Sequence, residues 1–454
     1  MKIQRIEFKH TGPFLNFSLD FQTQPAVTLL YAAPGVGKTQ FLKHIFHALT
    51  WLPARLKDIR TAGVAMLDQD ISLQRIQSKI EIVVEFPQEL GTLPISSNQQ
   101  ESSTQHCRWQ LYKTLNAESI GISRAETLEL EQLADLYRKV TKADPLQGLP
   151  FIAFYPSTRF INEINLLSKN APTTFHPHSA YDIATVPFFT FSKFFEWLRE
   201  VSDLENAQTA QLLQRLLNAP HPFEQIAEFK QQLLDAERHA HAPHLHSFQQ
   251  AVYRLFPEIS QIYLQYLPKL SIQVCYQQKM MRYQQLPNAI RTWIALIGDV
   301  VRRACLLNPK SPHPCQDVEG ILLIDEVDLG LADEQAMHII EQLHQLFPQL
   351  QFIFTTSRSQ ILELERDYQM LHLQPNAAHP LQSPQHRYHD WYGTLHEDTT
   401  EHVEHLHEQS HTAMEYILAK LPLLSSDEQD SLFAWLTQQR RVDHPSASDE
   451  FKSD

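Results

Sequence analysis

The sequence predicts an α/β protein whose core is a parallel β-sheet covered by helices. Short, continuous apolar runs have the pattern of strands that are buried on both faces, as in a parallel sheet. These runs span residues 26–31, 151–155, 320–326 and 351–356. Between them lie segments in which apolar residues recur at helical spacing, most clearly at 290–307. Buried strands that alternate with helices are typical of α/β folds.

The first strands differ from these runs because their apolar and polar residues alternate. Residues 3–8 and 14–21 have this pattern, and Gly12 and Pro13 supply the turn between them. Alternation predicts strands with one exposed face, so we expect a mixed β-lobe beside the parallel sheet. The other elements predicted up to residue 185 are a helix at 41–52, a strand at 80–86, a loop at 87–106, a strand at 108–114 and a helical segment at 123–143.

The second half of the chain begins with a mostly helical stretch. Beyond it the sequence predicts strands at 259–266, 270–276 and 368–373 and helices at 290–307 and 333–347. A stretch rich in Pro, His and Gln follows and is expected to be a linker, before two further helices at about 399–421 and 426–440. The predicted domains are a first lobe at 1–185, a helical insertion at 186–256, a second lobe at 257–373, the linker at 374–398 and a C-terminal helical extension and tail at 399–454.

Composition and charge exclude several classes of protein. Of the 454 residues, 43% are hydrophobic and 10% aromatic, which is enough to bury a core and argues against disorder. The net charge of −14 argues against non-specific binding of nucleic acid or membranes by the surface as a whole, while a local basic groove stays open. The four cysteines lack disulfide or zinc spacing. No apolar run resembles a membrane span or a signal peptide, so we expect a cytoplasmic protein.

The loop after residues 26–31 matches most of the phosphate-binding pattern G-x-x-x-x-G-K-[ST]. Ala32 replaces the first glycine. Glycines let backbone N–H groups turn toward phosphate oxygens, and the N-terminus of the following helix adds a positive dipole. Lys38 would reach the β- and γ-phosphates of ATP, and Thr39 would ligate Mg²⁺. The alternative is a chance Gly-Lys-Thr turn, which the flanking strand and helix argue against. The predicted nucleotide-binding residues of the loop are Pro34, Gly35, Val36, Gly37, Lys38, Thr39 and Gln40.

An acidic partner for this loop is expected where another strand ends. The apolar run 321–324 is followed directly by Asp325 and Glu326. Asp325 would hold Mg²⁺ through water, and Glu326 would polarise the attacking water as the catalytic residue. Glu85 is a weaker candidate because it is a lone acid at the end of its strand. The alternative for Asp325 and Glu326 is that they are solvated acids after a buried strand.

The distance along the chain between the two motifs is typical of one group of nucleotide-binding proteins. Lys38 and Asp325 are much farther apart than the corresponding residues of AAA+ proteins and small GTPases. In this respect the sequence resembles ABC-type ATPase heads of the SMC, RecF and OLD kind, and most of all a bacterial subgroup found in anti-phage defence modules. The segments that carry the resemblance are the opening hairpin, 151–160 with Tyr155, Pro156 and Arg159, 194–206, 298–309, 322–331 and 351–362.

Three elements depart from the pattern of that family. The signature Leu-Ser-x-Gly falls on residues 286–289, where Pro287 replaces the serine and Ala289 the glycine. The position of the switch histidine is Ser357, and the expected His-Pro is replaced near Ala332 and Asp333. In the family these elements sense or complete the hydrolytic site, in part from a second subunit. The resemblance therefore implies a chain that binds ATP and Mg²⁺ but hydrolyses ATP slowly or not at all.

Clusters of histidine and arginine elsewhere in the sequence have both a structural and a functional interpretation. Between residues 386 and 411 histidines are dense, and His407 and His411 could share a metal on one helix face; a solvated or partner-binding helix is the favoured reading. Arg302-Arg303 and Arg440-Arg441 could touch DNA phosphates, but salt bridges or solvation are favoured. The C-terminal helices either pack back on the head or dock an effector. No nuclease site is legible in the chain.

The function implied by the resemblance is regulatory. Such heads act as nucleotide-sandwiching dimers, so we expect a homodimer or higher homo-oligomer. The expected role is an ATP-binding subunit of an anti-phage defence complex, most like the Septu-type ATPase subunit, that gates a separate nuclease effector of the HNH type and reaches DNA through the complex. The alternatives are a DNA-repair or DNA-maintenance ATPase that acts directly on DNA, and a scaffold that no longer binds nucleotide.

Overall fold

In the computed structural model of the chain, residues Met1–Leu381 form one compact unit, and most residues of this unit are described. The described residues are 1–93, 105–116, 121–144, 147–159, 176–181, 191–217, 243–363, 368–374 and 376–380. The predicted C-terminal helices, the histidine-dense stretch, Arg440-Arg441 and the middle of the helical insertion lie outside these residues. The predicted domain boundaries therefore stay predictions. Within the described part of the chain, no helix has the length and apolarity needed to cross a bilayer.

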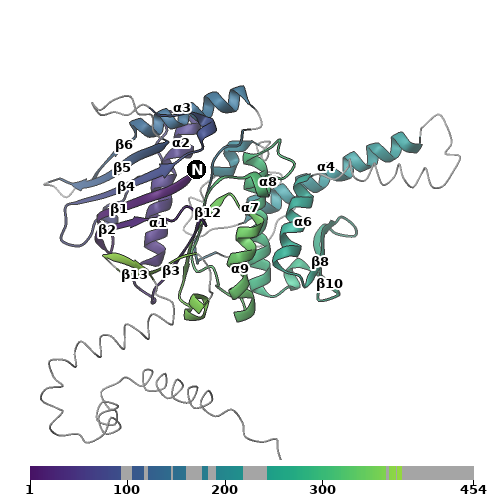
Figure 1. Ribbon diagram of the computed structural model, residues 1–454. Coiled ribbons are helices and arrows are strands. Elements are labelled where there is room, and N and C mark those ends of the chain that lie inside the picture. The colour runs from purple at the N-terminus through teal and green to yellow at the C-terminus, as the bar shows by residue number, and fades with distance from the viewer. Residues whose placement is uncertain are drawn as a thin grey trace, which may run out of the picture. The chain divides into compact units, whose positions relative to one another are not determined.

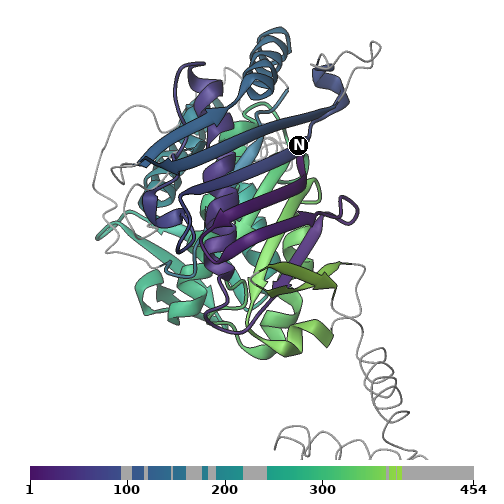
Figure 2. The same ribbon diagram turned by 90° about the vertical axis from the view of Figure 1, so that its left-hand side faces the viewer.

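An antiparallel sheet of five strands forms one side of the unit. Its order is β2-β1-β4-β5-β6, and Figure 2 shows it facing the viewer. The strands are β1 (Lys2–Thr11), β2 (Phe14–Asp20), β4 (Gln77–Glu85), β5 (His106–Leu115) and β6 (Gly121–Glu126). The alternation in the first two strands is reflected in their burial, since Phe14 and Phe17 are buried while Leu15 and Asn16 between them are exposed. The predicted one-sided β-lobe is thus present.

The second sheet has six strands in the order β14-β13-β3-β12-β11-β7. Neighbouring strands from β13 to β7 are parallel, and only β14 is antiparallel to its neighbour. The strands are β3 (Val27–Tyr31), β7 (Phe151–Tyr155), β11 (Gly320–Ile324), β12 (Leu350–Thr356), β13 (Gln369–Gln374) and β14 (Ala377–Pro380). Every residue of β11 and β12 is buried, as the continuous apolar runs predict.

The parallel sheet separates two hydrophobic cores. Leu30 and Leu323 point into the core shared with α1 (Lys38–Leu49) and the antiparallel sheet, and Leu29 and Leu322 into the core shared with the second-lobe helices. Helix α1 contacts both sheets, and Figure 1 shows it between them. The helices that line the second of these cores are α4 (Ser192–Leu217) and α6 (Pro243–Leu255) of the predicted insertion, and α7 (Asn288–Leu307) and α9 (Asp333–Leu346) of the predicted second lobe. This arrangement of two lobes around a strand–loop–helix unit confirms the predicted α/β fold, with a β-lobe beside a parallel-sheet core.

Helix α7 is the centre of the second core. All but four of its residues are buried, and it packs against α4 and α6. Gly298 allows the closest of these approaches, because a Cβ atom there would overlap the ring of Phe194 on α4. A glycine in mid-helix costs about 1 kcal/mol relative to alanine, so this packing explains a residue that the chain otherwise uses sparingly.

Several elements differ from the sequence prediction. The segment predicted as helical from residue 123 begins as β6, and α3 starts only at Leu128, because the exposed edge strand offers no apolar alternation to predict it from. The helix expected at 41–52 is two helices that meet at Thr50, α1 and α2 (Trp51–Lys57). The elements not named so far are α3 (Leu128–Ala143), α8 (Pro314–Asp317), strands β8 (Ile259–Gln265), β9 (Ser271–Tyr276) and β10 (Lys279–Arg282), and short 3-10 helices at Asp68–Asp70, Gln88–Leu90, Pro177–Tyr181, Tyr283–Gln285 and Ser359–Glu363.

A buried histidine on α1 should make the stability of this lobe depend on pH. His44 is 1% exposed, and neither ring nitrogen has a hydrogen-bond partner among the described residues. Burial lowers its pKa to about 4, because the charged ring would lose its hydration. In the unfolded chain the His44 ring becomes protonated below about pH 6.5, whereas in the folded chain it stays neutral until about pH 4. The free energy of unfolding is therefore fully retained above pH 6.5 and falls as the pH drops toward 4.

We expect His44→Leu to weaken this dependence. The difference in unfolding free energy between the variant and the wild type should shift in favour of the variant by about 3 kcal/mol between pH 7 and pH 4. Urea denaturation at several pH values measures it, and subtracting the two proteins cancels the titration of their shared carboxylates. A constant difference across this range would show that His44 does not titrate as its burial implies.

Candidate nucleotide-binding site

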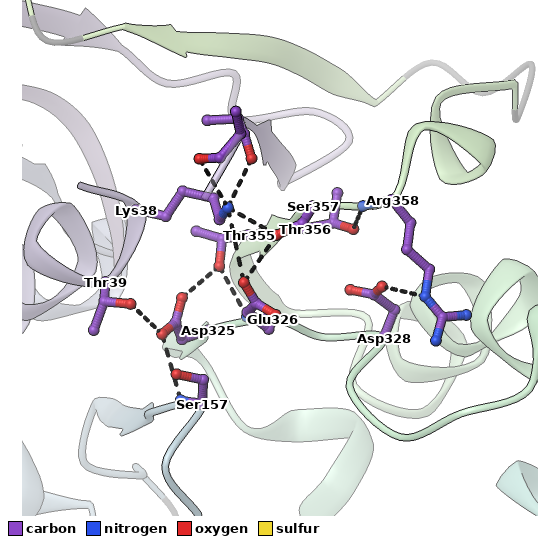
Figure 3. Close-up of polar contacts among 12 residues, drawn as sticks. Lys38, Thr39, Ser157, Asp325, Glu326, Asp328, Thr355, Thr356, Ser357 and Arg358 are labelled. Atoms are coloured by element: carbon purple, nitrogen blue, oxygen red, sulfur yellow. Dashed lines mark hydrogen bonds and ion pairs between the residues drawn. The ribbon is translucent and has the colours of Figure 1, made fainter. Parts of the chain in front are cut away.

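The predicted site residues lie at one edge of the parallel sheet. Strands β3, β12 and β11 are adjacent and point the same way, so their carboxyl ends share that edge. The loop 32–37 follows β3, Asp325 and Glu326 follow β11, and Ser357 follows β12. Figure 3 shows that side chains from these three segments converge. Residues far apart in the sequence therefore meet because of the strand order alone.

The loop 32–37 has the backbone that a phosphate cradle requires at its two glycines. Gly35 and Gly37 have φ values of 87° and 110°, which L-residues with a side chain rarely adopt. A Cβ on Gly37 would also lie 2.8 Å from Cγ of Pro13. Ala32 is not among the residues with positive φ, so the backbone there does not require the glycine that the pattern places at this position.

The other predicted binding residues of the loop are open to a ligand. Pro34, Gly35, Thr39 and Gln40 are exposed, and Val36 is half-buried. Gly37 is the N-cap of α1, so Lys38 and Thr39 form the first turn of that helix. Backbone N–H groups without an intrahelical partner and the positive end of the helix dipole therefore face the loop.

Lys38 is held by oxygen atoms on several sides. Its side chain is 6% exposed, and Nζ donates hydrogen bonds to the carbonyl oxygen of Ala32 at 2.7 Å and to Oγ of Ser357 at 2.8 Å. The carbonyl oxygen of Ala33 lies at 3.4 Å, and Oε1 of Glu326 forms an ion pair at 3.7 Å. A buried ammonium is costly without such partners. The carboxylate of Glu326 is the negative charge that the structure places next to this lysine.

Asp325 is fully buried and held by two hydroxyl groups. Oγ1 of Thr39 donates to its Oδ2 at 2.6 Å, and Oγ1 of Thr355 donates to its Oδ1 at 2.6 Å. The backbone N–H of Ser157 lies 3.4 Å from Oδ2. Thr39 and Asp325 thus present a hydroxyl and a carboxylate side by side, which is the oxygen ligand pair that Mg²⁺ takes beside nucleotide phosphates.

Glu326 has a backbone conformation that its neighbours enforce. Its φ of 46° is unusual for a residue with a side chain and costs on the order of 1 kcal/mol. The backbone N–H donates to Oγ1 of Thr355 at 2.9 Å, and Nη2 of Arg159 donates to its carbonyl oxygen at 2.9 Å. The carboxylate accepts a hydrogen bond from Oγ of Ser357 at 2.9 Å. Both backbone groups are therefore fixed while the side chain stays about one-third exposed.

Arg159 binds the backbone that follows β11. It is 7% exposed, and Nη1 donates to the carbonyl oxygens of Asp325 at 2.7 Å and Pro156 at 3.1 Å. Its guanidinium lies 5.9 Å from the ring centroid of Trp293 on α7. Burial lowers the pKa of Arg159 to about 10, while nearby carboxylates, Asp325 first among them, raise it. The guanidinium is therefore charged at neutral pH. Resemblance pointed to this residue, but its role becomes apparent only from the structure.

Three contributors to the site were missed by the sequence analysis. Thr355 fixes both Asp325 and Glu326, Ser157 adds a backbone donor, and Arg358 binds the loop after Glu326. The polar end of an otherwise apolar run, Thr355-Thr356, was the available signal for the first. The other two follow from neighbours that lie far away in the sequence.

The positions that depart from the family pattern are also placed by the structure. Pro287 is the N-cap of α7, so a residue without a hydroxyl or an N–H stands there. A Cβ on Gly330 would lie 3.3 Å from Cβ of Ala289, so the loop after Glu326 packs against this helix start. Ser357 contacts Lys38 and Glu326 as described above. Ala332 is the N-cap of α9, and Asp333 is its first residue.

Two alternatives from the sequence can be settled on the described residues. Arg302 and Arg303 are buried and both form ion pairs with Asp299, at 2.9 Å and 2.8 Å, so their favoured reading as salt-bridged is confirmed. Glu85 ends β4 in the antiparallel sheet and accepts a hydrogen bond from Gln4, away from the loop 32–37. Among the described residues, no group of His, Cys, Asp and Glu could hold a metal ion by itself. A metal at Thr39 and Asp325 would need further ligands, such as phosphate oxygens.

Comparisons with known proteins agree with an ATPase. The chain is 24% identical over 401 residues to "Retron Ec83 probable ATPase" of Escherichia coli, covering 80% of this chain and 69% of that protein. It is 23% identical over 360 residues to "Retron Vc95 probable ATPase" of Vibrio cholerae serotype O1 biovar El Tor, covering 74% and 66%. The chain thus spans about two thirds of the length of these relatives. No family model matches it.

Solved structures that it resembles include heads of SMC proteins. An SMC head bound to the C-terminal winged-helix domain of ScpA has a TM-score of 0.43 at 12% identity, over 86% of this chain and 99% of that one. The SMC head domain from Thermotoga maritima has a TM-score of 0.38 at 12% identity, over 84% and 100%.

Proposed function

We propose that this chain is an ATP-binding regulatory subunit of a bacterial anti-phage defence complex. In this proposal ATP and Mg²⁺ bind at the loop 32–40, hydrolysis is weak or absent, and nucleotide binding gates a separate nuclease effector. The observation that carries the first step is the convergence of Lys38, Thr39, Asp325 and Glu326 at one sheet edge. The chain is taken to act as a homodimer or larger homo-oligomer.

The residues present fit ATP with Mg²⁺. Lys38 now contacts neutral oxygens and one carboxylate at 3.7 Å, and phosphate oxygens would give it stronger, charge-assisted partners. The backbone N–H groups of the loop, with glycines at 35 and 37, would hold the phosphates. Thr39 and Asp325 would hold Mg²⁺, which neutralises charge on the β- and γ-phosphates. Glu326 stands where it could orient a water molecule.

Weak hydrolysis is supported by what surrounds these residues. ABC-type heads need donors from a second subunit at the γ-phosphate, and the serine and glycine that would supply them are Pro287 and Ala289 here. The loss of one such donor typically costs about 100-fold or more in rate. Glu326 is also engaged by Ser357 and Lys38, which compete with any water for its carboxylate.

We expect Glu326→Gln to change ATP turnover very little, because the wild-type rate is already low. Release of labelled phosphate at saturating ATP measures this, with Glu89, a surface carboxylate on another segment, replaced by Gln as a matched control. Turnover of several per second that is lost in Glu326→Gln and kept in Glu89→Gln would overturn the proposal of weak hydrolysis.

The defence role is supported by the relatives and by the resemblance of the sequence. Both relatives are named as retron ATPases. A separate effector of the HNH type, as in Septu-type systems, would supply nuclease activity that is not legible in this chain. Gating would follow from a shift between two conformations of the head, with ATP favouring one of them.

Co-purification tests the complex. The chain is expressed with the product of its neighbouring gene, and nuclease activity is assayed with and without ATP for the wild type and Lys38→Ala. We expect a stable complex whose nuclease activity responds to ATP in the wild type and not in the variant. If no effector co-purifies and the chain itself binds DNA tightly, it is a DNA-maintenance ATPase instead. If an effector co-purifies and its nuclease activity is the same with and without ATP, the chain acts as a scaffold.

A further inference from the structure

Arg358 occupies a position between the nucleotide site and the loop that follows Glu326. This loop, residues 328–333, is called the acidic loop below. Nε of Arg358 forms an ion pair with Oδ2 of Asp328 at 2.9 Å, and Nη1 forms one with Oδ1 of Asp333 at 2.9 Å. Nη2 donates to the carbonyl oxygen of Leu331 at 3.0 Å. One guanidinium thus binds both ends and the middle of the acidic loop, as Figure 3 shows for Asp328.

The ion pair between Arg358 and Asp328, at the start of the acidic loop, is buried on the side of the carboxylate and is therefore more than a surface ion pair. Asp328 is 4% exposed, and its Oδ1 has no hydrogen-bond partner within the part of the chain that the structure describes. A buried carboxylate depends on its cation, because its own hydration is lost. Asp333 is 84% exposed in its side chain, so its pair with Arg358 is screened by water and contributes little. The contact with Asp328 therefore dominates.

The residue next to Arg358 belongs to the nucleotide site. Ser357 accepts a hydrogen bond from Nζ of Lys38 and donates one to Oε1 of Glu326. Arg358 itself is tied to the end of β12 by a hydrogen bond from its N–H to Oγ1 of Thr356 at 3.0 Å. Two consecutive residues on one short segment thus contact the P-loop lysine and the acidic loop. A displacement of Ser357 is transmitted to Arg358 through a single peptide unit.

The acidic loop in turn contacts the start of α7. Gly330, with φ of 79°, lies so close to Ala289 that a Cβ there would come within 3.3 Å of the alanine methyl group. Leu329 beside it is 43% exposed. Contacts therefore run from Lys38 through Ser357 and Arg358 to the acidic loop, and that loop lies close to Ala289.

We infer that Arg358 is a positioning residue that sets the conformation of the acidic loop and makes it respond to what binds at the P-loop. The inference rests on the proposed binding of ATP. When phosphate oxygens replace Ser357 as acceptors for Lys38, the hydrogen bonds of Ser357 rearrange, and Arg358 moves the acidic loop with them. The acidic loop then differs between the free and the ATP-bound chain at the surface where Leu329 is exposed.

Hydrogen exchange tests this inference on the full chain. Peptides that cover 326–333 are compared in the wild type and Arg358→Gln, each with and without Mg²⁺-ATP. We expect roughly tenfold faster exchange of the acidic loop in the variant without nucleotide, because its local opening is no longer opposed by the guanidinium. We also expect that saturating ATP changes exchange of this loop in the wild type and not in the variant.

Four further variants complete the test. Asp328→Asn should repeat the effect of Arg358→Gln, because it removes the buried end of the same contact. Asp333→Asn should have little effect, since that pair is exposed, and Arg254→Gln, which loses an exposed hydrogen bond to Gln345, serves as a control elsewhere. Arg358→Lys keeps the charge but not the three contacts and should give an intermediate exchange rate.

The outcomes separate this inference from the proposed function. Unchanged exchange in Arg358→Gln would overturn the positioning role, and a variant whose acidic loop still responds to ATP would overturn the coupling. A wild-type chain that does not bind ATP would contradict the proposed function instead, and the comparison without nucleotide would still decide whether Arg358 sets the acidic loop.

Discussion

Lys38→Ala is expected to weaken ATP binding by about 100-fold or more, which corresponds to about 3 kcal/mol. In the structure the Lys38 ammonium is held in place by the carbonyl oxygen of Ala32 and by Ser357, with Glu326 as a weaker ionic partner. Because these contacts already order its long side chain, little further side-chain entropy is lost when phosphate oxygens take over as acceptors. Each charge-assisted hydrogen bond that disappears in the variant is worth about 1.5–3 kcal/mol. Titration with a fluorescent ATP analogue in Mg²⁺ buffer measures the affinity.

Lys43→Ala is the matched control for this change, since Lys43 lies on the same helix but is half-exposed and outside the loop. ATP should raise the melting temperature of the wild type and of Lys43→Ala, because a ligand that binds only the folded state stabilises it. It should leave Lys38→Ala unaffected. Equal ATP affinity in all three proteins would mean that the loop 32–40 is not the nucleotide site.

The parts of the fold that the sequence predicts are those in which burial is complete. Strands β3, β7, β11 and β12 are continuous apolar runs because both of their faces meet a core, so their position along the chain is visible without a structure. The edge strand β6 is the opposite case. Ile122, its second residue, is 45% exposed, and nothing in the composition of the strand separates it from the helix that follows.

The candidate site shows the same division. Lys38, Thr39, Asp325 and Glu326 could be named from sequence, because each follows a buried strand and parallel strands bring such ends together. Thr355, whose hydroxyl bonds both acids, has no such signature and gains its role from strand order alone. Contacts of this kind depend on which strands are neighbours, and a single sequence does not contain that information.

Arg159→Met is expected to lower the free energy of unfolding by about 3 kcal/mol. The side chain is nine-tenths buried or more, and it donates to three backbone carbonyl oxygens, those of Pro156, Asp325 and Glu326. Methionine fills a similar volume but offers no donor, so these carbonyl groups lose the guanidinium in a site closed to water. The carbonyl oxygen of Glu326 keeps one partner, the N–H of Leu329. The carboxylates of Asp325 and Asp328 also lose the charge of a nearby guanidinium, although Asp328 keeps its ion pair with Arg358. Urea denaturation followed by circular dichroism measures the change.

The same variant should also disturb the nucleotide site beyond its effect on stability. Glu326 keeps its φ of 46° because its N–H and its carbonyl oxygen are both held. Two donors reach the carbonyl oxygen, the backbone N–H of Leu329 at 3.0 Å and the guanidinium of Arg159 at 2.9 Å. Once the bond from Arg159 is lost, the carbonyl oxygen is held by Leu329 alone, and the peptide can relax more readily out of the left-handed region and turn Glu326 away from Lys38. We therefore expect Mg²⁺-ATP affinity measured well below the melting temperature to fall as well.

Arg159→Lys, which keeps the charge but loses the forked geometry, should lie between the two proteins. Arg254→Met removes an exposed arginine and should match the wild type in both measurements. If Arg159→Met is as stable as the wild type, the guanidinium does not hold the end of β11, and the unusual backbone of Glu326 must be maintained by its bonds to Thr355 and Leu329.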